Sequence, residues 1–212
     1  MDKYALILAG GDEVEKDLLA RYIKGSDFVV GADKGAETAY KNNFNIDLVV
    51  GDFDSINPTI LDRFKNKIIK YPVEKDKTDL ELALGIIIEK KYDNIIILNA
   101  LGNRLDHTMG NLFLLENFYN KKIRIIDNNS ETFLLNENKT ILENKNDLLL
   151  SIIPISESIQ IDRLTGVKYP LKNRTVNRGS TLCISNIIKD EVCLISISRG
   201  RAFIIITNNM EE

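Results

Sequence analysis

The sequence predicts an α/β fold, a mainly parallel sheet with flanking helices, followed by a small all-β sandwich domain. Six short runs rich in Ile, Leu and Val are typical of buried parallel strands. Stretches with helical spacing separate these runs, which indicates βαβ units. Helical spacing is lost after about residue 129, where short strand-like runs alternate with Asn, Gly, Pro and Ser. We therefore expect an α/β domain at 1–128 and a β-sandwich domain at 129–212.

The elements of the first domain follow from their apolar patterns. The strands are expected at residues 4–10, 27–33, 46–52, 67–72, 94–100 and 122–128. The clearest helix lies in 78–92, where Leu80, Leu84 and Ile87 belong to one apolar stripe. Thr78 followed by Glu81 forms a capping box, so this helix is expected to start near Thr78. Further helices are expected within 57–67, where Pro58 suits the first turn, and within 107–121.

Composition excludes several classes of function. The formal net charge of −3 provides no basic field for nucleic-acid binding. No apolar run reaches the length that spans a membrane, and the N-terminal apolar stretch is too short for a signal peptide. Cys183 and Cys193 lie in strand-like runs without metal-ligand spacing, so they are expected to be reduced core residues of a cytoplasmic protein.

Acidic residues follow four of the expected strands. Carboxyl ends of parallel strands meet at one edge of the sheet, where ligands bind. Like charges this close repel one another unless a cation lies between them, and carboxylates without His or Cys suit Mg²⁺. Asp52 and Asp54 are expected to point to the same side, because side chains alternate in extended backbone. The acidic residues of this edge are Asp33, Asp52, Asp54, Asp76, Asp79 and Asp106.

Cations and glycines occur on the same edge. Cations beside a carboxylate-held metal are what a polyphosphate site requires. Gly10 and Gly11, after the first strand, would allow close approach of a nucleotide. Neither a P-loop nor a G-x-G-x-x-G motif is present. The basic residues are Lys34, Lys75, Lys77 and Arg104.

Each of these residues also has a purely structural interpretation. The turn at 52–54 could be a solvated acidic loop, although turn chemistry accounts for only one of its two aspartates. Asp79 could interact with a helix dipole, and Asp33 could cap a helix. Arg104 could form a surface ion pair, and His107, the only histidine, could be a structural hydrogen bonder. The occurrence of acids at four strand ends favours a ligand site.

The segments "VVGDFDS", "EKDKTDLELAL", "LGNRLDHTMGNL" and, downstream, "LTGVKYPL" with "ISN" resemble the thiamine pyrophosphokinase family nearly end to end. The resemblance implies transfer of the pyrophosphoryl group of ATP to the hydroxyl of thiamine, giving thiamine diphosphate and AMP. It also implies a requirement for Mg²⁺ and a homodimer in which the thiamine pocket lies between subunits. Two alternatives remain open: a diphosphokinase for another hydroxymethyl heterocycle, such as a pterin, and a non-catalytic nucleotide-binding or sensor module.

The resemblance also implies roles for individual residues. Asp52, Asp54 and Asp76 resemble the metal ligands, and Asp79 and Arg104 complete the catalytic set. Ser185 and Asn186 resemble part of the thiamine pocket, although their local sequence taken alone favours a turn between strands. On the nucleotide side, the residues expected are Gly10, Gly11, Asp33, Lys34, Lys77, Gly102, Asp106 and His107.

Overall fold

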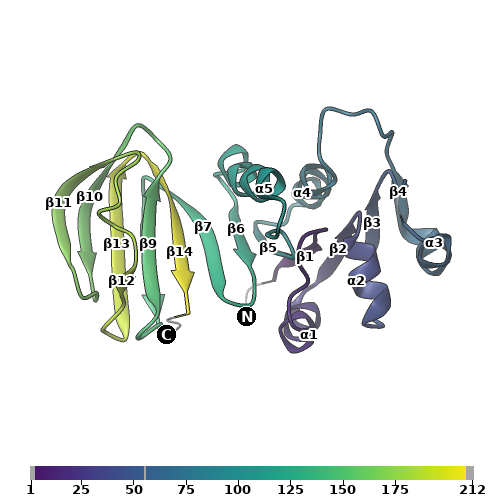
Figure 1. Ribbon diagram of the computed structural model, residues 1–212, viewed down its shortest axis with the longest axis horizontal. Helices are drawn as coiled ribbons and strands as arrows, with labels where there is room; N and C mark the ends of the chain where they lie inside the picture. Colours follow the sequence, from purple (N-terminus) through teal and green to yellow (C-terminus); the bar gives the residue numbers. More distant parts are fainter. Residues whose placement is uncertain (1–2, 55, 209–212) are drawn as a thin grey trace. The chain divides into compact units, whose positions relative to one another are not determined.

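The computed structural model describes residues 3–54 and 56–208 of the 212-residue chain. The chain divides into two compact units, residues 1–128 and 129–212. Strands and helices alternate in the first unit, and the second unit consists of strands (Figure 1). The predicted fold class is thereby confirmed. In the two described ranges, no helix combines the length and the apolarity needed to cross a membrane.

The strands of the first unit pair in the order β6-β5-β1-β2-β3-β4, and every pair is parallel. Each of the six apolar runs forms one strand, as predicted from their Ile, Leu and Val content. Because all pairs are parallel, the carboxyl ends of these strands lie at one edge. The strands are β1 (Ala5–Leu8), β2 (Phe28–Ala32), β3 (Leu48–Gly51), β4 (Ile68–Lys70), β5 (Asn94–Leu98) and β6 (Lys122–Ile126).

Two of the helices begin where the sequence supplies a side-chain cap. Thr78 Oγ1 accepts a hydrogen bond from the Glu81 amide at 3.2 Å, which confirms half of the predicted capping box. The Asn57 side chain accepts from the Thr59 amide at 3.0 Å, with Pro58 in the first turn. The helices are α1 (Lys16–Gly25), α2 (Gly35–Lys41), α3 (Pro58–Phe64), followed by the 3₁₀ turn η1 (Lys65–Lys67), α4 (Asp79–Glu89) and α5 (Leu105–Asn117).

The sheet of the first unit is covered on both faces. Leu6 and Leu8 of β1 pack in one apolar cluster with α1, α2 and α3. Figure 1 shows α4 and α5 on the opposite side of these strands from α1 and α2. Helix α4 buries Leu80, Leu84 and Ile87, the stripe that its sequence predicts. A sheet covered on both faces explains why its strands are apolar on both sides.

The second unit is a sandwich built around one apolar core. Strands β12-β9-β14-β7 pair antiparallel in that order, as do strands β11-β10-β13-β8. Cys183 and Cys193 are free and buried in this core, and burial raises the pKa of Cys193 to about 11. The strands are β7 (Ser130–Asn136), β8 (Lys139–Glu143), β9 (Leu149–Pro154), β10 (Ser158–Thr165), β11 (Leu171–Asn177), β12 (Asn186–Ile187), β13 (Val192–Arg199) and β14 (Arg201–Thr207).

The contact between α2 and β1 gives a prediction about stability. A Cβ atom on Gly35 would lie 1.8 Å from the backbone oxygen of Leu8. Gly35→Ala should therefore force the helix away from the strand and lower the free energy of unfolding by about 2–3 kcal/mol. Urea denaturation, followed by circular dichroism, measures this change.

Gly85→Ala is the matched control. Gly85 lies inside α4 and nothing approaches its missing Cβ within 4 Å. This substitution should raise stability by about 0.5–1 kcal/mol, because alanine loses less backbone entropy in a helix. Equal unfolding midpoints for Gly35→Ala and the unsubstituted chain would contradict the close approach of α2 to β1.

Candidate active site

A cavity of about 520 Å³ opens at the carboxyl ends of the strands of the first unit. Segments that follow β1, β2, β3, β4 and β5 all contribute to its lining. The edge predicted from the sequence therefore forms one site. The sequence-predicted residues that line this cavity are Gly10, Gly11, Asp33, Lys34, Asp52, Lys75, Lys77, Asp79, Gly102, Arg104 and His107.

Three predicted residues, Asp54, Asp76 and Asp106, are exposed and do not belong to the cavity lining. For Asp54 the expectation of extended backbone is wrong, because Phe53 has a positive φ of 62° and is buried. The Asp54 amide instead donates to Asp52 Oδ1 at 3.2 Å, which closes a tight turn. The alternation of side chains in extended strands therefore does not apply at this turn.

Lys75 lies at the centre of the charge arrangement. Its Nζ is 3.0 Å from Asp52 Oδ2 and 3.0 Å from Asp79 Oδ1. The three side chains are only 13%, 16% and 19% exposed, in the order Lys75, Asp52, Asp79. Burial alone would lower the pKa of Lys75, but the two carboxylates outweigh it and raise that pKa. The hydrogen bond from Lys75 in turn lowers the pKa of Asp52, so both groups stay charged.

Asp33 is the third partly buried carboxylate of the cavity. Burial raises its pKa against a backbone hydrogen bond from Lys34, and the charges of Asp79 and Asp52 raise it further. In the described ranges, no hydrogen-bond donor meets Asp33 Oδ1, although that atom is buried. Asp33 also has a positive φ of 48°, uncommon for a residue other than glycine. A buried acceptor without a donor is costly and is typical of a site that binds a ligand.

The donor chemistry suits a hard cation, although no cage is preformed. Within residues 3–54 and 56–208, no three His, Cys, Asp or Glu side chains lie close enough together to hold a metal ion. The predicted ligands Asp52, Asp54 and Asp76 are therefore not assembled around one point. Mg²⁺ commonly takes one or two carboxylates and completes its shell with phosphates and water, so a complete protein cage is not required.

The loops after β1 and β5 lie directly against each other. A Cβ atom on Gly11 would be 2.4 Å from the Leu101 oxygen and 2.6 Å from the Asn99 oxygen. A Cβ atom on Gly102 would be 2.8 Å from Asp12 Oδ1. These two glycines are thus required by backbone packing, whereas Gly10 has ordinary space around it, with its nearest neighbour 3.4 Å away.

Helix α5 anchors the loop that carries Arg104. The Thr108 hydroxyl bonds both the amide and the carbonyl of Gly102 at 3.1 Å, and Asn111 Nδ2 donates to the Ala100 oxygen at 2.7 Å. Sequence reasoning missed Thr108 and Asn111, both of which also line the cavity. Their spacing of three residues on a helix that follows the loop is the signal that could have identified them.

Arg104 and Asp106 form an exposed pair. Arg104 Nη2 lies 2.6 Å from Asp106 Oδ2, and Nε lies 3.3 Å from Asp106 Oδ1. The two side chains are 70% and 66% exposed, so the pair contributes little to stability. The surface ion pair considered from the sequence is therefore present. Its location at the cavity mouth leaves the Arg104 guanidinium able to exchange Asp106 for a ligand anion.

In the second unit, Ser185 and Asn186 lie at the start of β12. Ser185 is exposed and has a positive φ of 56°. Asn186 is buried: its Oδ1 accepts from the Tyr169 amide at 3.0 Å and the Ile187 amide at 2.9 Å, and its Nδ2 donates to the Tyr169 oxygen at 2.9 Å. The Asn186 side chain therefore fixes the backbone at Tyr169, 17 residues away, which differs from the local turn between strands considered from the sequence.

Family models match both units. The model for the thiamin pyrophosphokinase catalytic domain matches residues 19–126, and the model for the thiamin pyrophosphokinase vitamin B1 binding domain matches residues 139–201. The chain is 36% identical over 200 residues to thiamine pyrophosphokinase of Bacillus subtilis (strain 168), which covers 92% of this chain and 94% of that protein.

Solved structures agree with these matches. The crystal structure of thiamine pyrophosphokinase from Bacillus subtilis superposes with a TM-score of 0.86 at 34% identity, covering 98% of this chain and 100% of that one. The corresponding structure from Geobacillus thermodenitrificans gives a TM-score of 0.87 at 32% identity, covering 98% and 99%. The chain belongs to the thiamin pyrophosphokinase family.

Proposed function

We propose that this chain transfers the pyrophosphoryl group of ATP to the hydroxyl group of thiamine, giving thiamine diphosphate and AMP. The observation that carries the proposal is the cavity at the carboxyl edge of the sheet, in which carboxylates and cations from five strand ends meet. The match of both units to the two family domains favours this reaction over a pterin-type diphosphokinase or a sensor module.

The charges of the cavity suit the phosphates of ATP. Lys34, Lys75, Lys77 and Arg104 all line it. The planar guanidinium of Arg104 can hold two phosphate oxygens at once, whereas each lysine acts as a point charge. These cations would bind the polyphosphate chain, and Gly10 leaves room for it next to Lys34.

We propose that Mg²⁺ binds with ATP. Asp52 is the carboxylate of the predicted metal set that lines the cavity, and Asp54 and Asp76 are the further candidates from neighbouring loops. Two observations support a cation here. Asp33 Oδ1 is buried and accepts no hydrogen bond from the described residues, and the negative charge of Asp52 is already paired with a cation, Lys75. When bound, Mg²⁺ would neutralise charge on the phosphate oxygens.

The reaction depends mainly on how the reacting groups are positioned. A bond forms between the thiamine hydroxyl oxygen and the β-phosphorus as the hydroxyl proton is released. The bond from that phosphorus to the oxygen that bridges it to the α-phosphorus breaks, and AMP leaves. Positioning and charge neutralisation supply most of the rate enhancement in such transfers. Asp52 and Asp79 hold Lys75 at a fixed place in the cavity, and Arg104 is free to orient phosphate oxygens from its mouth.

We propose that thiamine contacts Ser185 and that Asn186 positions the segment around it. The exposed hydroxyl of Ser185 can bond a polar heterocycle, and the buried amide of Asn186 fixes the backbone beside it. We also propose a homodimer as the working unit. Its support in the second unit is a group of exposed apolar side chains, which are typical of interfaces: Tyr169 (60%), Leu182 (50%) and Ile184 (43%).

Asp52→Asn tests the carboxylate site. The substitution keeps the shape and an acceptor for the Asp54 amide but removes the negative charge. Turnover should fall by about 100-fold, because a carboxylate that would hold Mg²⁺ beside the reacting phosphates is lost. Product analysis by chromatography should show AMP from the unsubstituted enzyme, and ADP would mean transfer of a single phosphoryl group instead.

Asp62→Asn on α3 is the control for this experiment. Asp62 is exposed and does not line the cavity, so activity should be unchanged. Near-normal turnover of Asp52→Asn would remove Asp52 from the proposed site.

Arg104→Lys tests the phosphate contact. Lysine keeps the charge but cannot make two parallel hydrogen bonds, so kcat/KM for ATP should fall by about tenfold. Steady-state kinetics at varied ATP measures this change. Arg21→Lys on α1, also exposed and outside the cavity, should leave kcat/KM unaltered. An unchanged value for Arg104→Lys would leave Arg104 as a surface ion-pair residue only.

Ser185→Gly tests the thiamine contact without straining the backbone. Glycine adopts the positive φ of this position freely, so only the hydroxymethyl group is lost. KM for thiamine should rise by about tenfold, as expected for one lost hydrogen bond, while KM for ATP stays constant. Asn173→Gly, at another exposed position of positive φ in β11, serves as the control. Normal thiamine kinetics in Ser185→Gly would exclude the proposed contact.

A further inference from the structure

Asn99, the first residue after β5, combines features that the reaction described above does not use. Its side chain is only 1% exposed, which makes it one of few buried polar residues in the described ranges. Its backbone has a positive φ of 56°, a conformation that costs energy for any residue except glycine. Asn99 does not itself line the cavity. A strained, buried, polar residue next to a ligand site calls for a physical reason.

The hydrogen bonds of Asn99 supply that reason. Its Oδ1 accepts from the Val14 amide at 2.9 Å, and its backbone oxygen accepts from the Gly11 amide at 2.6 Å. Asn99 therefore holds the loop after β1 at two points three residues apart. Between them, the Asp12 amide donates to the Leu101 oxygen at 2.8 Å.

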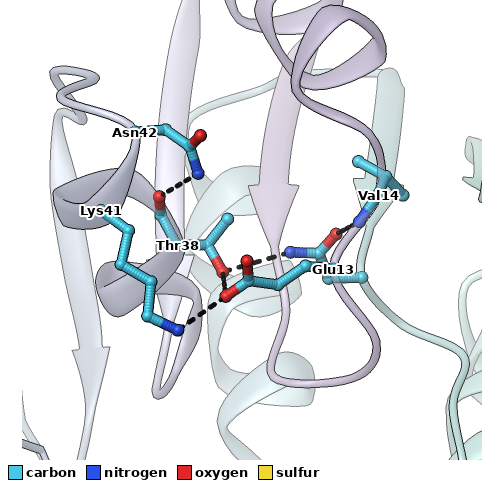
Figure 2. A network of polar contacts seen from close by, with 6 residues as sticks. Glu13, Val14, Thr38, Lys41 and Asn42 are labelled. Atoms are coloured by element: carbon cyan, nitrogen blue, oxygen red, sulfur yellow. Dashed lines mark hydrogen bonds and ion pairs between the residues drawn. The ribbon is translucent and has the colours of Figure 1, made fainter.

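A second set of bonds ties this loop to α2. Asn99 Nδ2 donates to Thr38 Oγ1 at 3.4 Å, and the Thr38 hydroxyl donates to Glu13 Oε1 at 3.3 Å. Lys41 Nζ pairs with the same Glu13 oxygen at 2.9 Å (Figure 2). Figure 2 shows Glu13 reaching from the loop toward Thr38 and Lys41, with Val14 beside it. The amide of Asn99 is thus the buried end of a network that connects the loop to α2.

The same loop forms one wall of the cavity. Gly10, Gly11 and Asp12 line it next to Lys34. Gly11 leaves no space between the loop and the carbonyls of Asn99 and Leu101, so the loop cannot shift toward β5. The position of this wall is therefore set by the bonds that Asn99 makes together with the bond from the Asp12 amide to the Leu101 oxygen.

We propose that Asn99 is a positioning residue for the nucleotide: it fixes the 9–14 loop so that the loop backbone presents a preformed surface to ATP. This inference rests on the proposed function, because it assigns the ATP subsite to that wall. The positive φ places the Asn99 carbonyl and side chain so that both can bond the loop, which is why the strain is retained. Asn99 acts through the loop and touches neither substrate.

Asn99→Gly is the direct test. Glycine tolerates a φ of 56°, so the variant removes the side-chain bonds without adding backbone strain. KM for ATP should rise by about tenfold, since the loop loses its anchor at Val14. KM for thiamine should change by less than about twofold, because the loop is assigned to the nucleotide. A uniform loss of folded enzyme would alter neither KM, so a change confined to ATP reports on the loop. Isothermal titration with ATP and Mg²⁺ should show the same weakening without any turnover.

Two further variants sharpen the result. Asn99→Asp keeps an acceptor for Val14 but buries a charge near Glu13, so it should weaken ATP binding less than Asn99→Gly does without restoring it fully. Asn43→Gly is the matched control, since Asn43 also has a positive φ, 57°, but is exposed and outside the cavity. Its KM values should equal those of the unsubstituted enzyme.

The outcomes separate this inference from the proposed function. An unsubstituted enzyme that binds ATP but makes no thiamine diphosphate would overturn the proposed function, while titration of the variants would still decide the role of Asn99. Unchanged ATP affinity in a folded Asn99→Gly would overturn the inference. If Asn99→Gly does not fold, Asn99→Asp decides: weaker ATP binding with thiamine binding within about twofold of the original supports the anchoring role, and equal weakening of both, or no weakening of either, contradicts it.

Discussion

Three partly buried carboxylates line one cavity at the edge of the parallel sheet, and the balance of their charge is the constraint on which the site depends. Asp33, Asp52 and Asp79 repel one another in a partly buried place, and Lys75 offsets two of them at 3.0 Å. Such an arrangement costs free energy unless a bound ligand or cation offsets the repulsion. A polyphosphate that arrives with a divalent cation meets both needs, because the cation engages carboxylates while the lysines engage phosphate oxygens.

Much of this architecture could be predicted from the sequence, because it depends on simple rules. Apolar runs fixed the six strands, and right-handed βαβ connections bring the carboxyl ends of parallel strands to one edge. The residues after each run therefore had to meet, whatever the details of the loops. The loss of helical spacing near residue 129 likewise predicted a sandwich, since short strand-like runs separated by Asn, Gly, Pro and Ser are typical of that fold.

Details below the level of whole elements could not be predicted in this way. One residue with positive φ, Phe53, removes the alternation that was expected to align Asp52 with Asp54. Phenylalanine rarely adopts this conformation, so the sequence carries no sign of it. The bridging position of Lys75 depends on the course of the 71–78 segment, which has no regular period. Gly11 was correctly placed at the cavity. The second reason for a glycine there is the close approach of the Asn99 and Leu101 carbonyls, which lie far along the chain and could not be predicted.

Two buried asparagines show how this protein defines its loops. Asn99 bonds the backbone at Val14 in the first unit, and Asn186 bonds the backbone at Tyr169 and Ile187 in the second. An amide side chain can donate and accept at once, so it can replace the strand partner that a loop lacks. A carboxylate could only accept, and burying its charge would cost more. Residues that resemble ligand contacts in the sequence can therefore act indirectly, by hydrogen-bonding the backbone of a loop beside the site. Because its Oδ1 already accepts two backbone amides, Asn186 belongs with Asn99 in this class, and the exposed Ser185 next to it is the side chain better placed to meet a substrate.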